Sequence, residues 1–172
     1  MEPAPIPKDE TARLKAVEDL KLLDTPPEER FDRITSIALR LFNVPISTIT
    51  LLDKNREWHK SCQGLDQRQS ERAYSFCGHA LWQDDIFIIE DATKDPRFAD
   101  NPMVVNAPHI RFYAGTSLFS LNGQRVGTLC IKDTKPRKFS PEDQQILKDL
   151  VVWVELEVNW YNLSARPRRP NW

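Results

Sequence analysis

Cysteine and histidine are the side chains of this sequence best suited to metal binding or nucleophilic chemistry, and the chain has three of each. Two pairs lie close together, His59 with Cys62 and Cys77 with His79. On a strand, residues three apart point to opposite faces, and on a helix, residues two apart sit about 200° apart around the axis. We therefore expect neither pair to chelate one ion and predict no metal site.

Thiol redox chemistry, in an enzyme or a sensor, would rest on Cys77, which falls in a predicted short helix. Cys130 falls in a predicted buried strand, and we interpret it as an inert core residue. Three scattered cysteines do not form a disulfide framework. Reduced thiols are therefore expected.

Two arginines, Arg97 and Arg111, could hold an anionic ligand, because guanidinium groups match carboxylates and phosphates. The structural alternative, which we favour, is that Asp95 or Asp91 pairs with Arg97 while Arg111 ties a strand to the same loop. His79 could be a haem ligand or a proton-sensitive group, but a hydrogen bond within the fold is the favoured interpretation.

A group of aromatic residues could line an apolar cavity or fill it completely: Phe76, Trp82, Phe98, Phe112 and Tyr113. Because side chains alternate along a strand, Phe112 and Tyr113 are expected on opposite faces. Only one of them should therefore point into any pocket.

The periodicity of the sequence predicts the elements that position these residues. Asn122-Gly123 between two strand-like runs indicates a hairpin, and Ser140-Pro141 indicates the start of a helix. The expected order is helix 9–23, helix 28–42, a hairpin of strands 46–52 and 57–62, loop 64–74, short helix 76–82, strand 86–89, long loop 91–108, a hairpin of strands 111–121 and 124–132, and helix 140–163. This order indicates an α+β domain with helices on the faces of an antiparallel sheet.

The last predicted helix carries more than one apolar stripe. One stripe would cover the sheet, and we assign the other to a homodimer; its residues are Leu147, Val151, Val154, Val158 and Tyr161. The alternative is a single wide core face.

Length and composition limit the possible functions. A chain of 172 residues with 40% hydrophobic and 28% charged residues fits one folded domain, and a net charge of −1 argues against a nucleic-acid partner. Without an apolar run near the roughly 18 residues that span a bilayer, we expect no membrane insertion and a cytoplasmic protein. We expect residues 1–10 to form a loose N-terminal arm, residues 11–163 the domain, and residues 164–172 a tail or the start of a linker.

Several multi-residue motifs occur in a fixed order: LDTPPEERFDRIT, VPISTITLLD, SFCGHAL, DATKDPRFADNP, IRFYAG, and GTLCIKD followed by RKFSPEDQQIL. In this order the chain resembles bacterial signalling GAF domains from about residue 11 to 160. The resemblance implies a central antiparallel sheet of about six strands, with terminal helices packed on one face. The short helix and the long loop would close a cavity over the other face.

Domains of this group commonly precede histidine kinase or diguanylate cyclase output domains, and many dimerise through their terminal helices. The resemblance thus implies a non-catalytic sensory domain that binds an unidentified small molecule and passes the signal through its terminal helices. The candidate pocket residues are Phe76, Cys77, His79, Trp82, Asp95, Arg97, Phe98, Arg111 and Tyr113. The sequence names neither a ligand nor a cofactor.

Other functions of GAF proteins fit less well. A bilin is disfavoured because Gly78 separates Cys77 from His79, and cyclic nucleotides because their Asn-Lys-Phe…Asp-Glu signature is not found. A thiol redox enzyme related to the free methionine sulfoxide reductases is an alternative. The strand that carries their reactive cysteine reads Ile88-Ile89-Glu90-Asp91 here, which counts against it. A dimerisation scaffold without a ligand is the other alternative.

Overall fold

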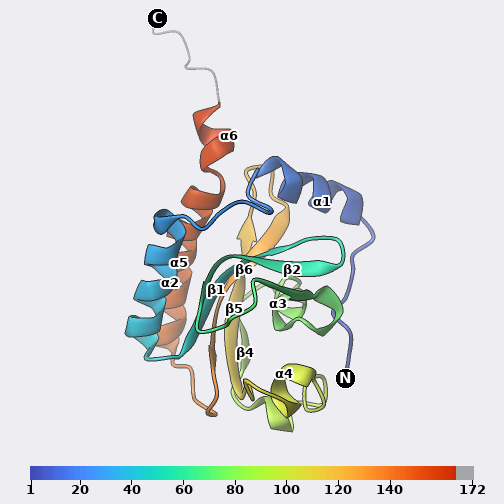
Figure 1. Cartoon of the computed structure of the whole chain (residues 1–172), viewed down its shortest axis with the longest axis vertical. Helices are drawn as coiled ribbons and strands as arrows, with labels where there is room; N and C mark the ends of the chain where they lie inside the picture. Colours follow the sequence, from blue (N-terminus) through green and yellow to red (C-terminus); the bar gives the residue numbers. More distant parts are fainter. Residues whose placement is uncertain (166–172) are drawn as a thin grey trace, which may run out of the picture.

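The computed structural model describes residues 1–165 and contains a six-stranded antiparallel sheet with helices on both faces (Figure 1). The strand order is β3-β2-β1-β6-β5-β4. The strands are β1 (Ile46–Leu52), β2 (Arg56–Gln63), β3 (Gln69–Glu71), β4 (Phe87–Ile89), β5 (Phe112–Phe119) and β6 (Arg125–Asp133). The helices are α1 (Glu10–Asp19), α2 (Glu29–Phe42), α3 (Phe76–Ala80), α4 (Pro102–Val105), α5 (Pro141–Val158) and α6 (Trp160–Ser164), with 3₁₀ turns η1 (Arg72–Tyr74) and η2 (Ala92–Lys94). The predicted fold class is confirmed; residues 166–172 of the predicted tail lie outside the described residues.

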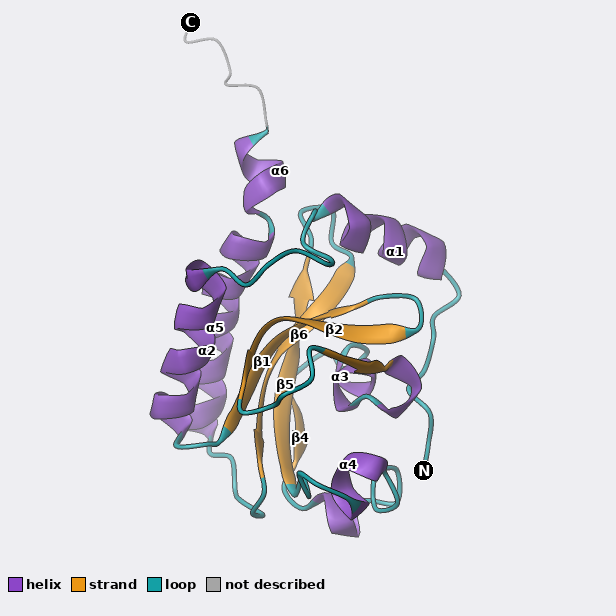
Figure 2. Cartoon of the chain, in the orientation of Figure 1, coloured by secondary structure: helices purple, strands orange, loops and turns teal. Residues whose placement is uncertain are grey.

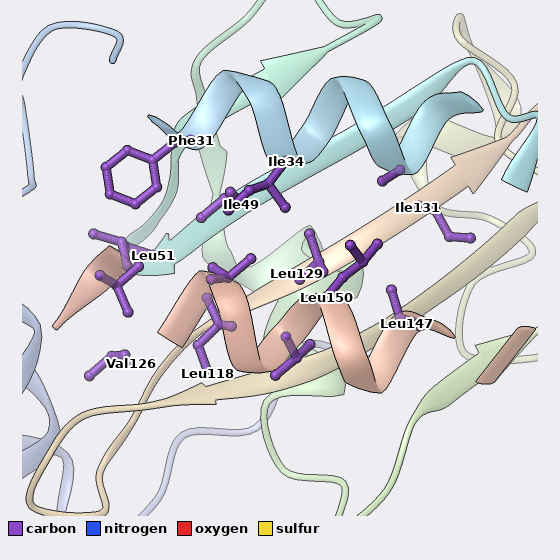
Figure 3. Packing of buried hydrophobic residues seen from close by; sticks show 14 of the residues in the cluster. Phe31, Ile34, Ile49, Leu51, Leu118, Val126, Leu129, Ile131, Leu147 and Leu150 are labelled. Carbon is purple, nitrogen blue, oxygen red and sulfur yellow. The ribbon is translucent and has the colours of Figure 1, made fainter. Parts of the chain in front are cut away.

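One face of the sheet is covered by α2 and α5, which lie side by side (Figures 1 and 2). Each helix turns apolar residues toward the sheet, as its sequence period predicts. Figure 3 shows the resulting packing of Phe31, Ile34, Ile49, Leu51, Leu118, Val126, Leu129, Ile131, Leu147 and Leu150. We call this face the helical face; burial of its apolar side chains is a main source of stability.

The helix α5 begins at the predicted residue but ends earlier than expected. The Ser140 hydroxyl accepts from the Asp143 amide, and the Asp143 carboxylate accepts from the Ser140 amide, which makes a capping box. The side-chain amide of Asn159 donates to the Phe119 and Glu155 carbonyls, and α6 follows as a separate short helix. Within residues 1–165, no helix is long and apolar enough to span a membrane.

The proposed dimer stripe on α5 needs correction. Leu147, Val151, Val154 and Val158 are buried in the chain's own core, so this stripe faces the sheet rather than a partner. Only Tyr161 of that set is exposed. The exposed large apolar side chains at the C-terminal end are Val152, Leu156, Trp160 and Tyr161.

The opposite face of the sheet is covered by α3 and by the segment that contains η2 and α4 (Figure 1). We call it the cavity face. Phe112 packs in the core of the helical face and Tyr113 in that of the cavity face, which confirms the predicted alternation. The predicted loop 64–74 contains β3 and η1, and the long loop 91–108 is folded on itself around η2 and α4.

The N-terminal residues, predicted to be a loose arm, instead pack against the domain. The Glu2 amide donates to the Arg97 carbonyl and the Ala4 amide to the Ala73 carbonyl. Ala4 is buried against α3, where a Cβ on Gly78 would lie 2.6 Å from the Ala4 Cβ. A proline lacks a backbone donor but keeps its carbonyl, and the Pro5 carbonyl accepts from the Trp82 side chain.

Candidate functional site

The middle of the cavity face is polar although it is buried. Thr48 and Thr50 on β1 point to this face, because the β-branched run ISTITLL is a strand with alternating sides. Their hydroxyl groups lie 2.8 Å apart, and Thr50 Oγ1 lies 2.8 Å from Nδ1 of His59. Thr48 Oγ1 lies 3.1 Å from the sulfur of Cys130 on β6. Strand alternation thus lines up hydroxyl, imidazole and thiol groups.

A β-bulge overturns the spacing argument for His59 and Cys62. Ile49 pairs with Ser61 while Thr50 pairs with His59, so Lys60 is an extra residue in β2. His59 and Cys62 therefore lie opposite Thr50 and Thr48, on one face, despite being three residues apart. Within the described residues, no group of three or more candidate ligands is placed to hold a metal ion.

Glu57 is the buried carboxylate of this face. It accepts a hydrogen bond of 2.6 Å from the Ser70 hydroxyl and another from the Ser75 hydroxyl. Burial raises the pKa of Glu57, but the charge of Lys132 and the two hydroxyl donors outweigh it and lower the pKa. Ser75 also caps α3, because its oxygen accepts from the Gly78 amide at 3.0 Å.

His59 is only 2% exposed and stays neutral. Burial lowers the pKa of His59 to about 4, against the opposing effect of the Glu57 charge. Nδ1 of His59 forms a hydrogen bond with Thr50, and no described residue forms one with Nε2. That nitrogen is available to a ligand.

Lys132 on β6 is fully buried on the same face, opposite Ile46 on β1 and Tyr113 on β5. Its Nζ has no hydrogen-bond partner among the described residues. Burial lowers the pKa of Lys132, but the neighbouring Cys130, Cys77 and Glu57 raise it overall. The ammonium is therefore charged, and such a group costs free energy in a core unless another group compensates for it.

A cavity of about 350 Å³ lies beside Glu57 and His59. Its walls come from the segment after β2 and from the end of α4, and its lining residues are Glu57, His59, Gly64, Leu65, Asp66, Gln67, Gln69, Ser70, Met103, Ala107 and Pro108. This volume lies within the range of small-molecule sites, which combine apolar walls with a few polar groups.

Two larger hollows offer less chemistry. One of about 590 Å³ beside β4 has its charges paired, with Lys138 at 2.7 Å from Glu90. Another, of about 920 Å³ between α1 and the β1–β2 turn, includes Arg56 paired with Asp24 at 2.8 Å. Of these three hollows, the one of about 350 Å³ adjoins the buried Glu57 and His59, so we take it as the candidate site.

The predicted aromatic residues fill space instead of lining an opening. Phe76 stacks on Phe98 at 4.3 Å between ring centroids and on Tyr113 at 5.3 Å, and all three are buried. Gly115 makes room for Tyr113, because a Cβ there would lie 2.3 Å from the Tyr113 hydroxyl oxygen. The hydroxyl group donates to the sulfur of Cys77 at 3.4 Å.

The predicted polar residues make structural contacts. His79 Nε2 lies 3.0 Å from the Glu2 carbonyl oxygen, and Trp82 Nε1 donates to the Pro5 carbonyl at 2.9 Å. Burial lowers the pKa of His79, which fits the favoured interpretation of a histidine bonded within the fold. These contacts hold the N-terminal arm against α3.

The two candidate anion-binding arginines also have internal partners. Arg97 pairs with Asp95 at 2.7 Å, and Arg111 donates to the Val104 and Ile110 carbonyls at 3.0 Å. None of the nine predicted pocket residues borders the cavity beside Glu57. Their part in ligand binding stays a prediction.

Glu57, Ser70 and Lys132 are not among the site residues predicted from the sequence. Glu57 and Lys132 are charged residues inside β-rich segments. A charged residue at such a position is a signal from which a buried functional group could have been predicted. Ser70 belongs to a stretch predicted as a surface loop, so its approach to Glu57 had no local signal.

Comparisons with known proteins agree with this fold. The family model described as GAF domain matches residues 26–158. A cyclic di-GMP phosphodiesterase of Pseudomonas aeruginosa is 44% identical over 133 residues, which are 77% of this chain and 23% of that protein. The chain thus spans about a quarter of the length of this curated relative.

Solved structures share the fold at low sequence identity. A domain of a putative two-component sensor histidine kinase from Sinorhizobium meliloti has a TM-score of 0.62 at 13% identity, covering 80% of this chain and 94% of that chain. The free methionine-R-sulfoxide reductase of Neisseria meningitidis, solved with its substrate, has a TM-score of 0.62 at 15% identity. The match covers 94% of this chain and 99% of that chain. At these identities the likeness concerns the fold alone.

Proposed function

Because the chain belongs to the GAF domain family, we propose that it is a non-catalytic sensory domain that binds a small molecule in the cavity beside Glu57 and His59. The observation that carries the proposal is that two buried titratable groups, Glu57 and His59, line one cavity, with the buried charge of Lys132 near enough to lower the pKa of Glu57. Burying such groups costs free energy, so a face used only for packing would be apolar. Perturbed titratable groups cluster at functional sites.

The groups at the cavity define what a ligand must offer. The ionised Glu57 accepts hydrogen bonds, and the neutral His59 has Nε2 free for a donor or an acceptor. Apolar contacts come from Leu65 and Met103. A ligand would therefore be small, with hydrogen-bond donors at one end and an apolar part at the other.

The make-up of the cavity supports binding without catalysis. The residues that line it include no cysteine, and the Ser70 hydroxyl is engaged by Glu57. The segment Ile88 to Asp91 also lacks the thiol that the reductase resemblance would require. A thiol reductase is therefore not the function that these observations favour.

Signal output would pass through the helical face. We place this domain ahead of an output domain of the histidine kinase, diguanylate cyclase or cyclic di-GMP phosphodiesterase type, since a cyclic di-GMP phosphodiesterase is a curated relative. A homodimer would use the exposed side chains of Val152, Leu156 and Trp160. A ligand shifts the helices only if it binds their two arrangements with different affinity.

A dimerisation scaffold without a ligand is the second candidate. The observation that favours it is the packed aromatic cluster of Phe76, Phe98 and Tyr113, which occupies the space under α3. In that case Phe98→Ala would lower the stability of the fold without altering any binding.

A thermal-shift screen of fractionated bacterial metabolite extract tests the ligand proposal. We expect at least one fraction to raise the melting temperature of the wild-type chain, because a ligand that binds only the folded state stabilises it. Glu57→Gln should lose the shift. Glu90→Gln, in the larger hollow beside β4, is the matched control and should keep it. Equal shifts in both variants would contradict the proposed site.

A further inference from the structure

Two cysteines from distant parts of the sequence meet beneath α3. The sulfur of Cys77 on α3 lies 3.8 Å from the sulfur of Cys130 on β6, and neither residue is exposed. From the sequence, Cys130 is expected to be inert, and Cys77 is the residue on which thiol redox chemistry would rest. The fold instead brings the two thiols into van der Waals contact, which is the separation from which a disulfide can form after a small side-chain movement.

The surroundings of the pair give its two members different roles. Burial raises the pKa of Cys130, but hydrogen bonds from Cys77 and Thr48 and the charge of Lys132 lower it to about 7. The hydrogen bond to Cys130, together with burial, raises the pKa of Cys77 well above its ordinary value. Of the two, Cys130 is therefore the thiol that ionises more readily, and Cys77 is the one that keeps its proton.

The buried ammonium of Lys132 lies within electrostatic influence of this pair. Its Nζ has no hydrogen bond among the described residues and is fully buried, and the charges of Cys130, Cys77 and Glu57 raise the pKa of Lys132. A thiolate at Cys130 supplies negative charge near this cation. The contact between the two sulfur atoms and the nearby positive charge of Lys132 both favour Cys130 as the nucleophile.

We propose that Cys77 and Cys130 form an intramolecular disulfide when the protein meets a hydroperoxide. The Cys130 thiolate attacks the terminal peroxide oxygen and becomes a sulfenic acid as the O–O bond breaks. The leaving alkoxide, which is hydroxide when the oxidant is hydrogen peroxide, takes a proton from solvent and departs as an alcohol or as water. The Cys77 thiol then loses its proton and attacks the sulfenic sulfur, and the sulfenic oxygen leaves as water. Two thiols are oxidised and one peroxide is reduced.

Cys62 provides an internal comparison. It is half-buried, and its sulfur contacts the carbonyl oxygens of Leu65 at 3.6 Å and Gln67 at 3.9 Å, not another sulfur atom. Burial raises the pKa of Cys62. It is the most accessible of the three thiols but has no sulfur in contact, so it should not join the disulfide.

Access to the pair depends on α3, which is only five residues long and lies over the sulfur atoms. Small and neutral hydrogen peroxide needs only a slight local opening, whereas a bulky maleimide needs a larger one. Hydrogen peroxide should therefore react with these two cysteines faster than maleimide labels them. This inference does not depend on the proposed ligand.

The test is to treat the full chain with hydrogen peroxide without reductant and to measure its intact mass and disulfide-linked peptides. We expect the intact mass to fall by the mass of two hydrogen atoms. Peptide mapping should show one linked pair, which joins Cys77 to Cys130, and dithiothreitol should fully reverse the change. Cys62→Ser should behave as wild type. Cys77→Ser should form no disulfide and should trap a sulfenic acid at Cys130, detected as a dimedone adduct.

Three results would overturn the proposal: a linked pair that includes Cys62, a disulfide only between two chains, or no linked pair while Cys62 is oxidised. Circular dichroism of each variant checks its fold. If a serine variant does not fold, the peptide map of wild-type protein still decides, because it identifies the joined residues directly.

Discussion

The two faces of the sheet are built from the same strands but differ in chemistry. On β1, Ile49 and Leu51 enter an apolar core under α2 and α5, whereas Thr48 and Thr50 join a polar network under α3. The helical face has large apolar side chains that interlock. The cavity face keeps a carboxylate, an imidazole, an ammonium and two thiols out of water. The helical face stabilises the fold, whereas the cavity face buries titratable groups at a cost in stability.

Neighbouring residues of β6 test this difference most strongly. Leu129 points into the helical face and Thr128 to the cavity face, where its hydroxyl has no partner among the described residues. We expect Leu129→Ala to lower the free energy of unfolding by about 2–5 kcal/mol, through lost burial and a cavity. Thr128→Val should leave it unchanged or raise it, because an unpaired buried hydroxyl is removed. Urea denaturation measures both, and equal losses would remove the distinction between the faces.

Low pH should lower the free energy of unfolding through His59 on the cavity face. Its pKa falls from an ordinary 6.5 to about 4 in the folded chain, so between these values the unfolded chain binds more protons and stability falls as pH falls. This difference of about 2.5 pH units corresponds to roughly 3 kcal/mol, lost between about pH 7 and pH 4. We expect His59→Asn to flatten the pH profile of unfolding. The same change at the exposed His109 is the control, and an identical flattening there would refute the assignment.

The N-caps of α3 and α5 allow a matched comparison. Ser75 caps α3 and donates to Glu57, while Ser140 caps α5 on the helical face. Each change to alanine should cost about 0.5–2 kcal/mol, the usual range for an N-cap. Only Ser75→Ala should also speed disulfide formation between Cys77 and Cys130, because it loosens the helix above them. Timed peroxide treatment with peptide mapping checks this, and acceleration by both variants would show a general loss of stability instead.

The smallest effect on stability is expected at the exposed apolar side of the C-terminal helices. Leu156→Ser and Trp160→Ser should change the free energy of unfolding by less than about 0.5 kcal/mol in the monomer, because both side chains are exposed. They should weaken a homodimer. Light scattering coupled to gel filtration over a range of concentrations measures this, and an unchanged dimer would place the interface elsewhere.

Sequence reasoning succeeded where local signals determine structure. The Asn122-Gly123 hairpin, with Gly123 at a φ of +81°, and the Ser140 cap followed directly from residue type. The period of each amphipathic helix identified its apolar residues, but it could not say whether an apolar stripe on α5 faced the sheet or a partner.

The candidate site could not be assembled from sequence, since its parts depend on tertiary contacts. The bulge at Lys60 turns His59 and Cys62 to one face, against the regular alternation. The contact between Cys77 and Cys130 joins residues 53 positions apart. Backbone carbonyls of the N-terminal arm, which no side-chain pattern reports, engage His79 and Trp82.

Native mass spectrometry of the chain, as purified and after incubation with bacterial metabolite extract, tests most directly whether the cavity face holds a small molecule. The structure predicts a reproducible non-covalent adduct on the wild-type chain that is lost in Glu57→Gln and kept in Glu90→Gln. A wild-type spectrum without any adduct under both conditions, or an adduct that survives Glu57→Gln unchanged, would contradict a ligand site beside Glu57.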